Sequence, residues 1–261
     1  MQSPGSQLAA MRQAAPLVHN ITNYVAMTPM ANILLAAGAS PAMVHAREEA
    51  AEFAGIADAL TVNIGTLSPA WCEAMHAAAA AATAAGKPWA FDPVAAGATA
   101  YRRQVSAGLL ALGPTVIRGN ASEILALDGA AGSGRGVDSG DPVEAAEAAA
   151  RSLSQHTGAI VAVTGETDFV TDGRRAARIS NGDPLMPRVT ALGCALTGIV
   201  AAFTAAASDR YDATVAAIAY YGLAGERAAE RAEGPGSFMA AFVDAVSAID
   251  AGTLDRGARI A

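Results

Sequence analysis

Short apolar segments alternate with longer, alanine-rich segments along the first two thirds of the chain. The apolar segments are rich in Val, Ile and Leu and lie at residues 16–21, 41–44, 59–65, 88–94, 115–120 and 159–165. Continuous apolar runs of this length are typical of strands that are covered on both faces. The pattern therefore favours a sheet buried between two layers of helices.

Helical segments separate most of these predicted strands. We expect helices at residues 27–39, 46–57, 68–86, 101–113 and 141–158. Several of them begin at Ser or Asp and end at Gly, which are the residue types that cap helix starts and ends. A β-α-β-α order requires parallel strands joined by right-handed helical crossovers, so we predict an α/β fold: a mostly parallel central sheet with helices on both faces.

The pattern changes after residue 165. Residues 168–180 contain two short strand-like runs around Asp172-Gly173 and predict a hairpin that extends the edge of the sheet. Residues 194–250 are almost entirely helical in pattern, with a break at 234–238. The sequence shows neither an internal repeat nor an interdomain linker, so we expect one domain over residues 1–261, with the glycine-rich segment 128–141 as a candidate mobile flap.

Composition and charge narrow the class of protein. The chain has 261 residues, 52% of them hydrophobic, which is enough for the core of one large domain or two small ones. Its net charge of −7 gives no electrostatic reason to expect nucleic acid or an anionic membrane as a partner. The first residues lack the pattern of a secretory signal, and no apolar stretch reaches the roughly 20 residues of a membrane-spanning helix, so we expect a soluble cytoplasmic protein. The two cysteines, Cys72 and Cys194, are far apart and are expected to be free thiols.

Candidate chemistry gathers where the predicted strands end. In open α/β sheets, ligands bind beyond the carboxyl ends of the strands. The residues that follow these ends are Asn20, Asn23, Met43, Asp92, Arg118, Asn120, Glu123, Thr164 and Glu166. Several of them also have ordinary structural explanations: Asp92-Pro93 could end a strand, the Thr164 hydroxyl could satisfy a backbone group, and Met43 could belong to the core. Their combination at one edge of the sheet favours a functional site.

Arg118, Asn120 and Glu123 allow two interpretations. The spacing N-x-x-E at a strand-to-helix junction is close to a capping box, in which each side chain bonds to the other residue's backbone N–H. An arginine beside a carboxylate also suits phosphate binding, with Mg²⁺ held directly or through water. We favour the second interpretation. The chain lacks the P-loop motif G-x-x-x-x-G-K-[ST], so the phosphates of a bound nucleotide would have to be held by a different loop.

The segment VTALGCALTG, residues 189–198, places Gly193 and Cys194 at the expected start of a helix. Backbone N–H groups at a helix start attract anions, and the pKa of a cysteine there is lowered from about 8.5. The alternative is a small packed hydrophobe, which is our interpretation of Cys72 inside the helical segment 68–86. The position of Cys194 favours a chemical role.

Several longer motifs occur in order along the chain: PLVHNITN, LLAAGASPAMV, FDPVAAGA, IRGNASEI, SGRGVD, VTGETDFVTDG, GDPLM, GCAL, GERA and EGPGSF. In these motifs, from Pro16 to Phe242, the chain resembles the hydroxyethylthiazole kinases, thiamine-salvage enzymes with a ribokinase-like fold. The resemblance implies Mg²⁺-dependent phosphorylation of the primary hydroxyl of 4-methyl-5-(2-hydroxyethyl)thiazole by ATP, in a homotrimer with active sites at the subunit interfaces.

The resemblance also implies roles for individual residues. Cys194 takes the position of the catalytic base, where ribokinase relatives commonly carry aspartate. The other implied roles are thiazole binding by Met43, Asn23 and Ala191, ATP binding by Arg118, Thr164 and Gly193, and metal binding by Glu123 and Asp92.

One motif departs from the family pattern. The family usually has G-T-G-C where this chain has Ala191-Leu192-Gly193-Cys194. Alanine tolerates positive φ less well than glycine, and Leu192 adds bulk beside the expected phosphate path, so the anion cradle could be altered. Two alternatives therefore stay open: a kinase for a related alcohol such as hydroxymethylpyrimidine, and a thiazole-binding protein with weakened catalysis.

Overall fold

The computed structural model describes residues 2–130 and 142–261. Most of segment 128–141, the candidate flap, lies outside these residues. The described chain forms an eight-stranded sheet in the order β2-β1-β3-β4-β5-β6-β7-β8. The strands are β1 (Leu17–Ile21), β2 (Ser40–Ala42), β3 (Ala59–Asn63), β4 (Trp89–Asp92), β5 (Val116–Asn120), β6 (Ile160–Thr164), β7 (Asp168–Thr171) and β8 (Ala176–Ile179).

The sheet is parallel from β2 to β6, and the hairpin β7–β8 is added antiparallel at one edge. The predicted parallel α/β sheet and its edge hairpin are therefore confirmed. The central strands β1, β3 and β4 are buried at nearly every residue, as expected from their continuous apolar runs.

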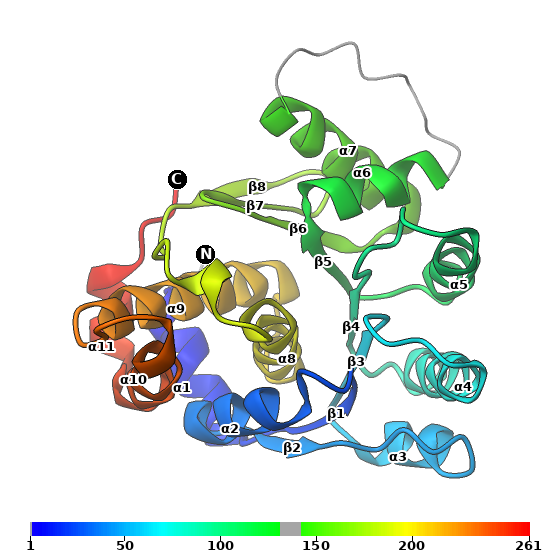
Figure 1. Ribbon diagram of the computed structural model, residues 1–261, viewed down its shortest axis with the longest axis horizontal. Coiled ribbons are helices and arrows are strands. Elements are labelled where there is room, and N and C mark those ends of the chain that lie inside the picture. Colours follow the sequence, from blue (N-terminus) through cyan, green and yellow to red (C-terminus); the bar gives the residue numbers. More distant parts are fainter. Residues whose placement is uncertain (1, 131–141) are drawn as a thin grey trace.

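Helices cover both faces of the sheet, as predicted (Figure 1). In Figure 1, helices α3 to α7 lie on one face, and helices α1, α2 and α8 to α11 lie on the other. Each face has its own cluster of buried apolar side chains. The helices are α1 (Pro4–Ala14), α2 (Met27–Ala37), α3 (Ala50–Ile56), α4 (Pro69–Ala84), α5 (Ala100–Leu110), α6 (Ala121–Ala130), α7 (Pro142–Thr157), α8 (Leu192–Ala205), α9 (Arg210–Ala229), α10 (Pro235–Ala248) and α11 (Ala251–Gly257).

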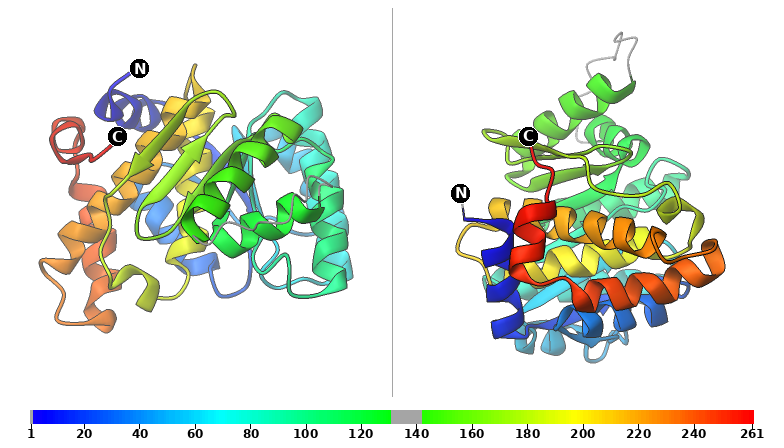
Figure 2. Two further views of the ribbon diagram at one scale, coloured as in Figure 1. Left: turned by 90° about the horizontal axis from the view of Figure 1, so that it is seen from above. Right: turned by 90° about the vertical axis from the view of Figure 1, so that its left-hand side faces the viewer.

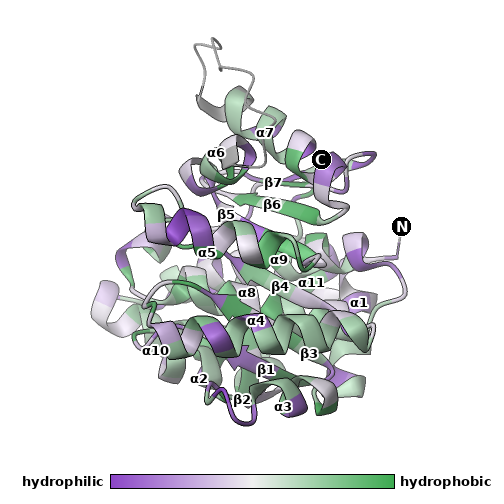
Figure 3. Ribbon diagram, turned by 90° about the vertical axis from the view of Figure 1, so that its right-hand side faces the viewer, coloured by the Kyte–Doolittle hydropathy of each residue, from purple (hydrophilic) through white to green (hydrophobic). Residues whose placement is uncertain are grey.

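Helices α8 and α9 form the centre of their layer. Both are buried around most of their circumference, because their sequences are apolar on nearly all sides. A Cβ at Gly198 of α8 would lie 2.7 Å from Cε of Met30, so glycine allows α2 to approach α8 closely. In Figure 3, hydrophobic colouring is clear on α9 and on β6 of the sheet beside it. The buried α8 is thereby held with its first turn at the ends of the strands.

Two terminal helices lie outside the elements predicted from the pattern. Ser3 caps α1 by accepting a hydrogen bond from the Ser6 N–H, and Pro4 occupies the first helical position, which is a recognisable start signal. Helix α1 lies beside α11 (Figure 2), and the Gly5 N–H donates to Oδ1 of Asp255 at 2.6 Å. Most of the other boundaries agree with the prediction to within a few residues.

A search for membrane spans over the described residues identified no single helix long and apolar enough to cross a bilayer. The pair α10 and α11 passes the test of length and composition only when joined across a bend of 111°.

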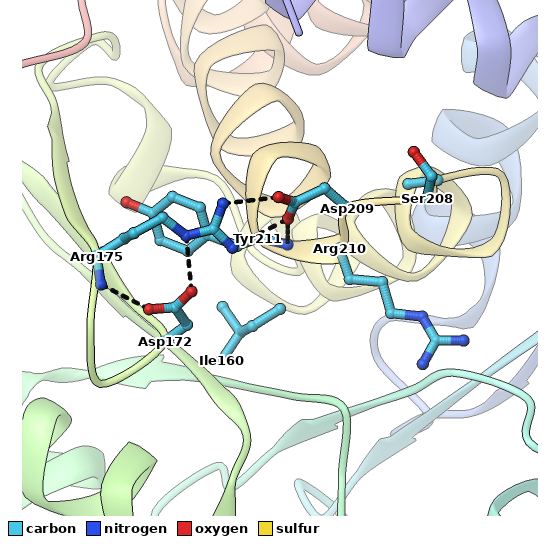
Figure 4. Close-up of a pocket in the computed structure, with 8 residues that line it drawn as sticks. Ile160, Asp172, Arg175, Ser208, Asp209, Arg210 and Tyr211 are labelled. Carbon is cyan, nitrogen blue, oxygen red and sulfur yellow. Dashed lines mark hydrogen bonds and ion pairs between the residues drawn. The ribbon is translucent and has the colours of Figure 1, made fainter. Parts of the chain in front are cut away.

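The β7–β8 turn is tied to the start of α9 through Arg175 (Figure 4). Nε of Arg175 donates to Oδ2 of Asp172 at 2.8 Å, and Nη1 donates to Oδ2 of Asp209 at 2.6 Å. The guanidinium also lies 4.2 Å from the ring centroid of Tyr211. These contacts attach the edge hairpin to the helical layer.

We expect Arg175→Ala to lower the free energy of unfolding by about 1 kcal/mol at pH 7, because the ion pairs are partly exposed and screened. Hydrogen bonds from Arg175 lower the pKa of Asp209, and they also lower the pKa of Asp172 against the opposing effect of its burial. A carboxylate with a lowered pKa stabilises the fold above its ordinary pKa and loses that contribution as the pH falls. Chemical denaturation should therefore show a difference between wild type and variant at pH 7 that shrinks below pH 3.8, the ordinary Asp value.

Arg174→Ala is the matched control, because Arg174 is an exposed arginine in the same turn and its backbone N–H, which bonds to Asp172, is kept. An equal loss of stability in the two variants would contradict the role given to Arg175.

Candidate functional site

The candidate site lies where the carboxyl ends of β1, β3, β4, β5 and β6 meet the first turn of α8. Parallel strands bring all their carboxyl ends to one edge of the sheet. Asn23, Asn63, Asp92 and Arg118 come from four different strand ends, and Cys194 comes from α8. The fold thus brings together residues that are up to 171 positions apart in the sequence.

A chain of hydrogen bonds connects the thiol of Cys194 to a buried carboxylate. Nδ2 of Asn23 donates to Sγ of Cys194 at 3.2 Å and to Oδ1 of Asn63 at 2.9 Å. Nδ2 of Asn63 donates in turn to Oδ2 of Asp92 at 2.7 Å. Thr197, one turn further along α8, also donates to this carboxylate oxygen, at 3.1 Å. The sulfur therefore faces polar groups and is not sealed among aliphatic side chains.

Asn63 is a site residue that the sequence analysis missed. It is the last residue of β3, and it is 1% exposed. The rule that selects the residues at strand ends would have found it in the motif TVNIG, because it occupies the same position on β3 that Asp92 occupies on β4.

The prediction that the pKa of Cys194 is lowered was wrong. Burial raises the pKa of this thiol, and the negative charge of Asp92 raises it further. Hydrogen bonds from Asn23 and Asn63 and the charge of Arg118 act in the opposite direction without reversing the shift. Cys194 is therefore mainly a protonated thiol at neutral pH, and only its minor thiolate form can accept a proton.

The first turn of α8 offers fewer free amides than the motif suggests. The N–H of Ala195 donates to the carbonyl of Ala191 at 2.9 Å, and Leu196 lies deeper in the helix, where each N–H bonds to the carbonyl four residues earlier. The N–H groups left without an intrahelical partner are those of Leu192, Gly193 and Cys194. An anion at this helix start would therefore be held by these three amides.

Arg118 links the helix start to β6. Its side chain is 11% exposed. Nη1 donates to the carbonyl of Gly193 at 3.0 Å and lies 3.7 Å from Oδ2 of Asp92, and Nη2 donates to Oγ1 of Thr164 at 2.6 Å. The guanidinium thus holds a positive charge beside the buried carboxylate and in the wall of an adjoining cavity.

That cavity has a volume of about 960 Å³ and is large enough for a nucleotide. Arg118, Thr164 and Gly193 line it together with residues of the loop after β8. Glu166, selected from the sequence, also lines it, as does Asp168, which the sequence analysis missed. Burial raises the pKa of Asp168 to about 6.

Asp92 and Glu123 differ in how their oxygens are used. Oδ1 of Asp92 is buried and has no hydrogen-bond partner among the described residues. Burial raises the pKa of Asp92 to about 6, and Glu123 adds to this effect while Arg118 opposes it. Glu123 and Asn120 form the capping box: the Asn120 N–H donates to Oε2 of Glu123 at 2.9 Å, and the Glu123 N–H donates to Oδ1 of Asn120 at 3.0 Å.

The remaining oxygen of Glu123 accepts a hydrogen bond from the Ala95 N–H at 3.0 Å. Glu123 therefore has a structural role whether or not it also contacts a metal. Within residues 2–130 and 142–261, no cluster of three or more His, Cys, Asp or Glu side chains is arranged to hold a metal ion. A cation at this site would need oxygen ligands from a bound molecule or from water in addition to these carboxylates.

Met43 and Ala191 are two of the residues for which the resemblance implies thiazole binding. Met43 follows β2, is partly buried and packs against the core on the α8 face of the sheet. Ala191 is the residue before α8 and has a φ of 70°, in the left-handed region. Among the other residues selected from the sequence, Asn20 is buried and accepts a hydrogen bond from Thr61 at 2.9 Å, so it serves the sheet. Cys72 is buried in the core, as predicted.

The left-handed conformation of Ala191 leads to a stability prediction. A residue with a Cβ loses about 1–2 kcal/mol in this conformation, whereas the greater unfolded-state freedom of glycine costs about 0.5–1 kcal/mol. We expect Ala191→Gly to raise the free energy of unfolding by about 0.5 kcal/mol in chemical denaturation. Ala195→Gly, a buried helical control four residues later, should lower it by about 1 kcal/mol. A loss of stability in both variants would contradict the strain at Ala191.

Comparison with known proteins defines first the fold and then the family. A ribokinase-like superfamily protein from Enterococcus faecalis shares the fold, with a TM-score of 0.64 at 15% identity over 90% of this chain and 88% of that chain. The chain thus has the ribokinase-like fold.

The family model of the Hydroxyethylthiazole kinase family matches residues 8–252. A hydroxyethylthiazole kinase from Cereibacter sphaeroides is 65% identical over 260 residues, covering 100% of this chain and 99% of that protein. The structure of a hydroxyethylthiazole kinase from Pyrococcus horikoshii is similar with a TM-score of 0.92 at 40% identity, covering 99% of this chain and 98% of the other. The chain belongs to the hydroxyethylthiazole kinase family.

Proposed function

We propose that this protein transfers the γ-phosphoryl group of ATP to the primary hydroxyl of 4-methyl-5-(2-hydroxyethyl)thiazole. The observation that carries the proposal is that Arg118 and Gly193 line the 960 Å³ cavity, while Cys194, the next residue after Gly193, accepts a hydrogen bond from Asn23. The family membership and the names of the similar proteins support the choice of acceptor alcohol. The flanking of one continuous sheet by both apolar clusters supports one domain over residues 1–261.

The nucleotide occupies the cavity in this proposal. Arg118 and Thr164 contact its phosphates, and the N–H of Gly193 faces the group that is transferred. Arg118 is suited to this role because its Nη atoms are already fixed by Gly193 and Thr164, so little reorganisation is needed when charge develops. Phosphoryl transfer depends mainly on such positioning and charge stabilisation.

Asp92 and Glu123 are the residues that would hold Mg²⁺. The unpartnered, buried Oδ1 of Asp92 fits this role, and Mg²⁺ commonly uses one or two carboxylates together with phosphate oxygens and water. The ion would neutralise charge on the phosphates. Because the Glu123 oxygens already accept backbone N–H bonds, a contact through water suits this residue best.

Cys194 acts on the acceptor alcohol, which lies near Met43, Asn23 and Ala191. The thiol first loses its own proton to solvent. As the alcohol oxygen then bonds to the γ-phosphorus and the bond to the ADP oxygen breaks, the hydroxyl proton passes to the Sγ thiolate. The raised pKa of the thiol makes Sγ a strong proton acceptor once it is ionised, and Asn23 stabilises it by donating a hydrogen bond. Proton transfer late in the reaction places only a modest demand on this base.

We also propose a homotrimer whose interfaces adjoin the thiazole site. Exposed apolar side chains on and before α2 support an interface there, because Tyr24, Val25 and Leu35 are each more than half exposed.

A coupled ADP-release assay with the thiazole alcohol, in the presence and absence of Mg²⁺, tests the proposed function. We expect Mg²⁺-dependent turnover with a higher kcat/KM for the thiazole alcohol than for hydroxymethylpyrimidine. Preference for the pyrimidine would favour the first alternative. Thiazole binding in calorimetry without ADP release would favour a binding protein. The structure speaks against this alternative, because Ala191 already adopts the left-handed conformation expected of the family's glycine.

A further inference from the structure

Residues 258–261 pair with β8, directly before the loop that forms one wall of the cavity. The Arg178 N–H donates to the carbonyl of Ala261 at 2.8 Å, and the Ser180 N–H donates to the carbonyl of Arg259 at 3.0 Å. The pairing is antiparallel, with Ile179 opposite Ile260. Figure 1 shows this end of the chain beside β8. Beyond β8, the chain forms the 180–187 loop, in which every residue except Leu185 lines the cavity.

Glu226 of α9 anchors the 180–187 loop. Oε1 of Glu226 accepts hydrogen bonds from the Gly182 N–H at 2.9 Å and from Nδ2 of Asn181 at 3.1 Å. The loop also packs tightly on α9, because a Cβ at Gly222 would lie 2.6 Å from the carbonyl oxygen of Asn181. This cavity wall is therefore held by contacts with α9, together with a hydrogen bond from Nδ2 of Asn181 to the carbonyl of Gly257 at 2.9 Å.

Arg259 contacts both the loop and its anchor. Its guanidinium donates to Oε1 of Glu226 at 2.6 Å and to Oε2 at 3.1 Å, and it also donates to the carbonyl of Ser180 at 2.5 Å. Its backbone N–H donates to Oδ1 of the buried Asn181 at 2.7 Å. Arg259 thus closes a network in which the same carboxylate orients the loop backbone.

The contacts of Arg259 differ from those of an ordinary surface ion pair, because they also hold a loop in place. The Arg259 side chain is 53% exposed, and an isolated pair of this kind contributes little to stability. Here, however, loss of the guanidinium leaves Glu226 free to turn away from Gly182 and Asn181, and removes the bond to Ser180. The expected effect is therefore on the cavity wall and not on the overall stability of the fold.

We propose that Arg259 is a positioning residue for the nucleotide, acting through Glu226 and Asn181 to hold the 180–187 loop as a wall of the cavity. The proposal rests on the proposed function for the identity of the nucleotide. It assigns a role in ATP binding to a residue that does not itself line the cavity and lies outside the motifs of the resemblance.

The test compares Arg259→Ala and Arg259→Lys with Arg256→Ala. Arg256, on α11, is an exposed arginine three positions away that lies against Gly252. We expect Arg259→Ala to raise the KM for ATP and the Kd for ADP roughly tenfold, because a preorganised wall becomes loose. The KM for the thiazole alcohol and the kcat at saturating ATP should stay within about twofold of wild type. Arg259→Lys should fall between wild type and Arg259→Ala, because lysine keeps the charge but not the bidentate contact.

An unchanged KM for ATP in Arg259→Ala, or an equal rise in the KM of both substrates, would overturn the proposal. An equal effect of Arg256→Ala would also overturn it. If Arg259→Ala is unfolded at the assay temperature, the KM for ATP and the Kd for ADP of Arg259→Lys are compared with those of wild type and Arg256→Ala instead. Unchanged values in Arg259→Lys would then overturn the proposal. If the wild type releases no ADP with the thiazole alcohol, the proposed function fails, whereas the ratio of the calorimetric Kd values for ADP still decides whether Arg259 positions the nucleotide.

Discussion

Cys194→Ala is expected to lower kcat about 100-fold while leaving the KM for ATP nearly unchanged, because a general base contributes about this much to a proton transfer. The raised pKa of the thiol also predicts the pH dependence. Since only the thiolate can accept the proton, kcat of the wild type should rise as the pH increases through the neutral range. The same measurement on Cys194→Ala should give a flatter profile.

Cys72→Ala is the control for the loss of a thiol. Cys72 is buried in α4, in the apolar cluster on the face of the sheet opposite α8, and its sulfur lies 3.1 Å from the hydroxyl of Tyr101. We expect this variant to keep the wild-type kcat and pH profile. A Cys194→Ala enzyme with an unchanged kcat would exclude Cys194 as the base.

Arg118→Ala is expected to lower kcat/KM for ATP about 1000-fold, which is the lower range for an arginine that stabilises a transferring phosphoryl group. Its guanidinium is fixed by Gly193 and Thr164 and balances the buried charge of Asp92. Without it, the pKa of Asp92 rises further above its present value of about 6, so the carboxylate would be more protonated at neutral pH. Steady-state kinetics with varied ATP measures the loss.

Arg118→Lys separates charge from geometry. Lysine keeps the positive charge but cannot contact Gly193 and Thr164 at the same time, so we expect Arg118→Lys to keep only part of the wild-type activity. Arg103→Ala, which removes an exposed arginine of α5, should leave the kinetics unchanged. Full activity of either Arg118 variant, shown by thermal unfolding to be folded, would remove Arg118 from the phosphate site.

The periodicity of the chain was sufficient for the layered fold, because the strands and most of the helices are encoded by local runs of residues. Helices α1, α6 and α11 were not among the predicted elements. The apolar runs at 59–65 and 88–94 became β3 and β4, and the Asp172-Gly173 turn became the edge hairpin. Helix α3 is shorter than predicted: residues 46–49 precede it, since apolar content alone does not fix where a helix starts.

Part of the candidate site could be predicted from the rule that ligands bind beyond the carboxyl ends of parallel strands. That rule found Asn23, Asp92, Arg118 and Thr164, which the structure connects by hydrogen bonds or close contacts. It could not give the pKa of Cys194, because the burial of the thiol and the nearness of Asp92 depend on tertiary packing. Nor could it find Arg259, whose partners lie 33 and 79 positions away in the sequence.

The most direct test of the central claim is a crystal structure with a non-hydrolysable ATP analogue and the thiazole alcohol bound together. The account predicts that the γ-phosphate lies against the amides of Gly193 and Cys194 and contacts Arg118. It also predicts that the alcohol oxygen lies within hydrogen-bond distance of Sγ of Cys194. A γ-phosphate bound away from the first turn of α8, or an alcohol oxygen turned away from this sulfur, would contradict it.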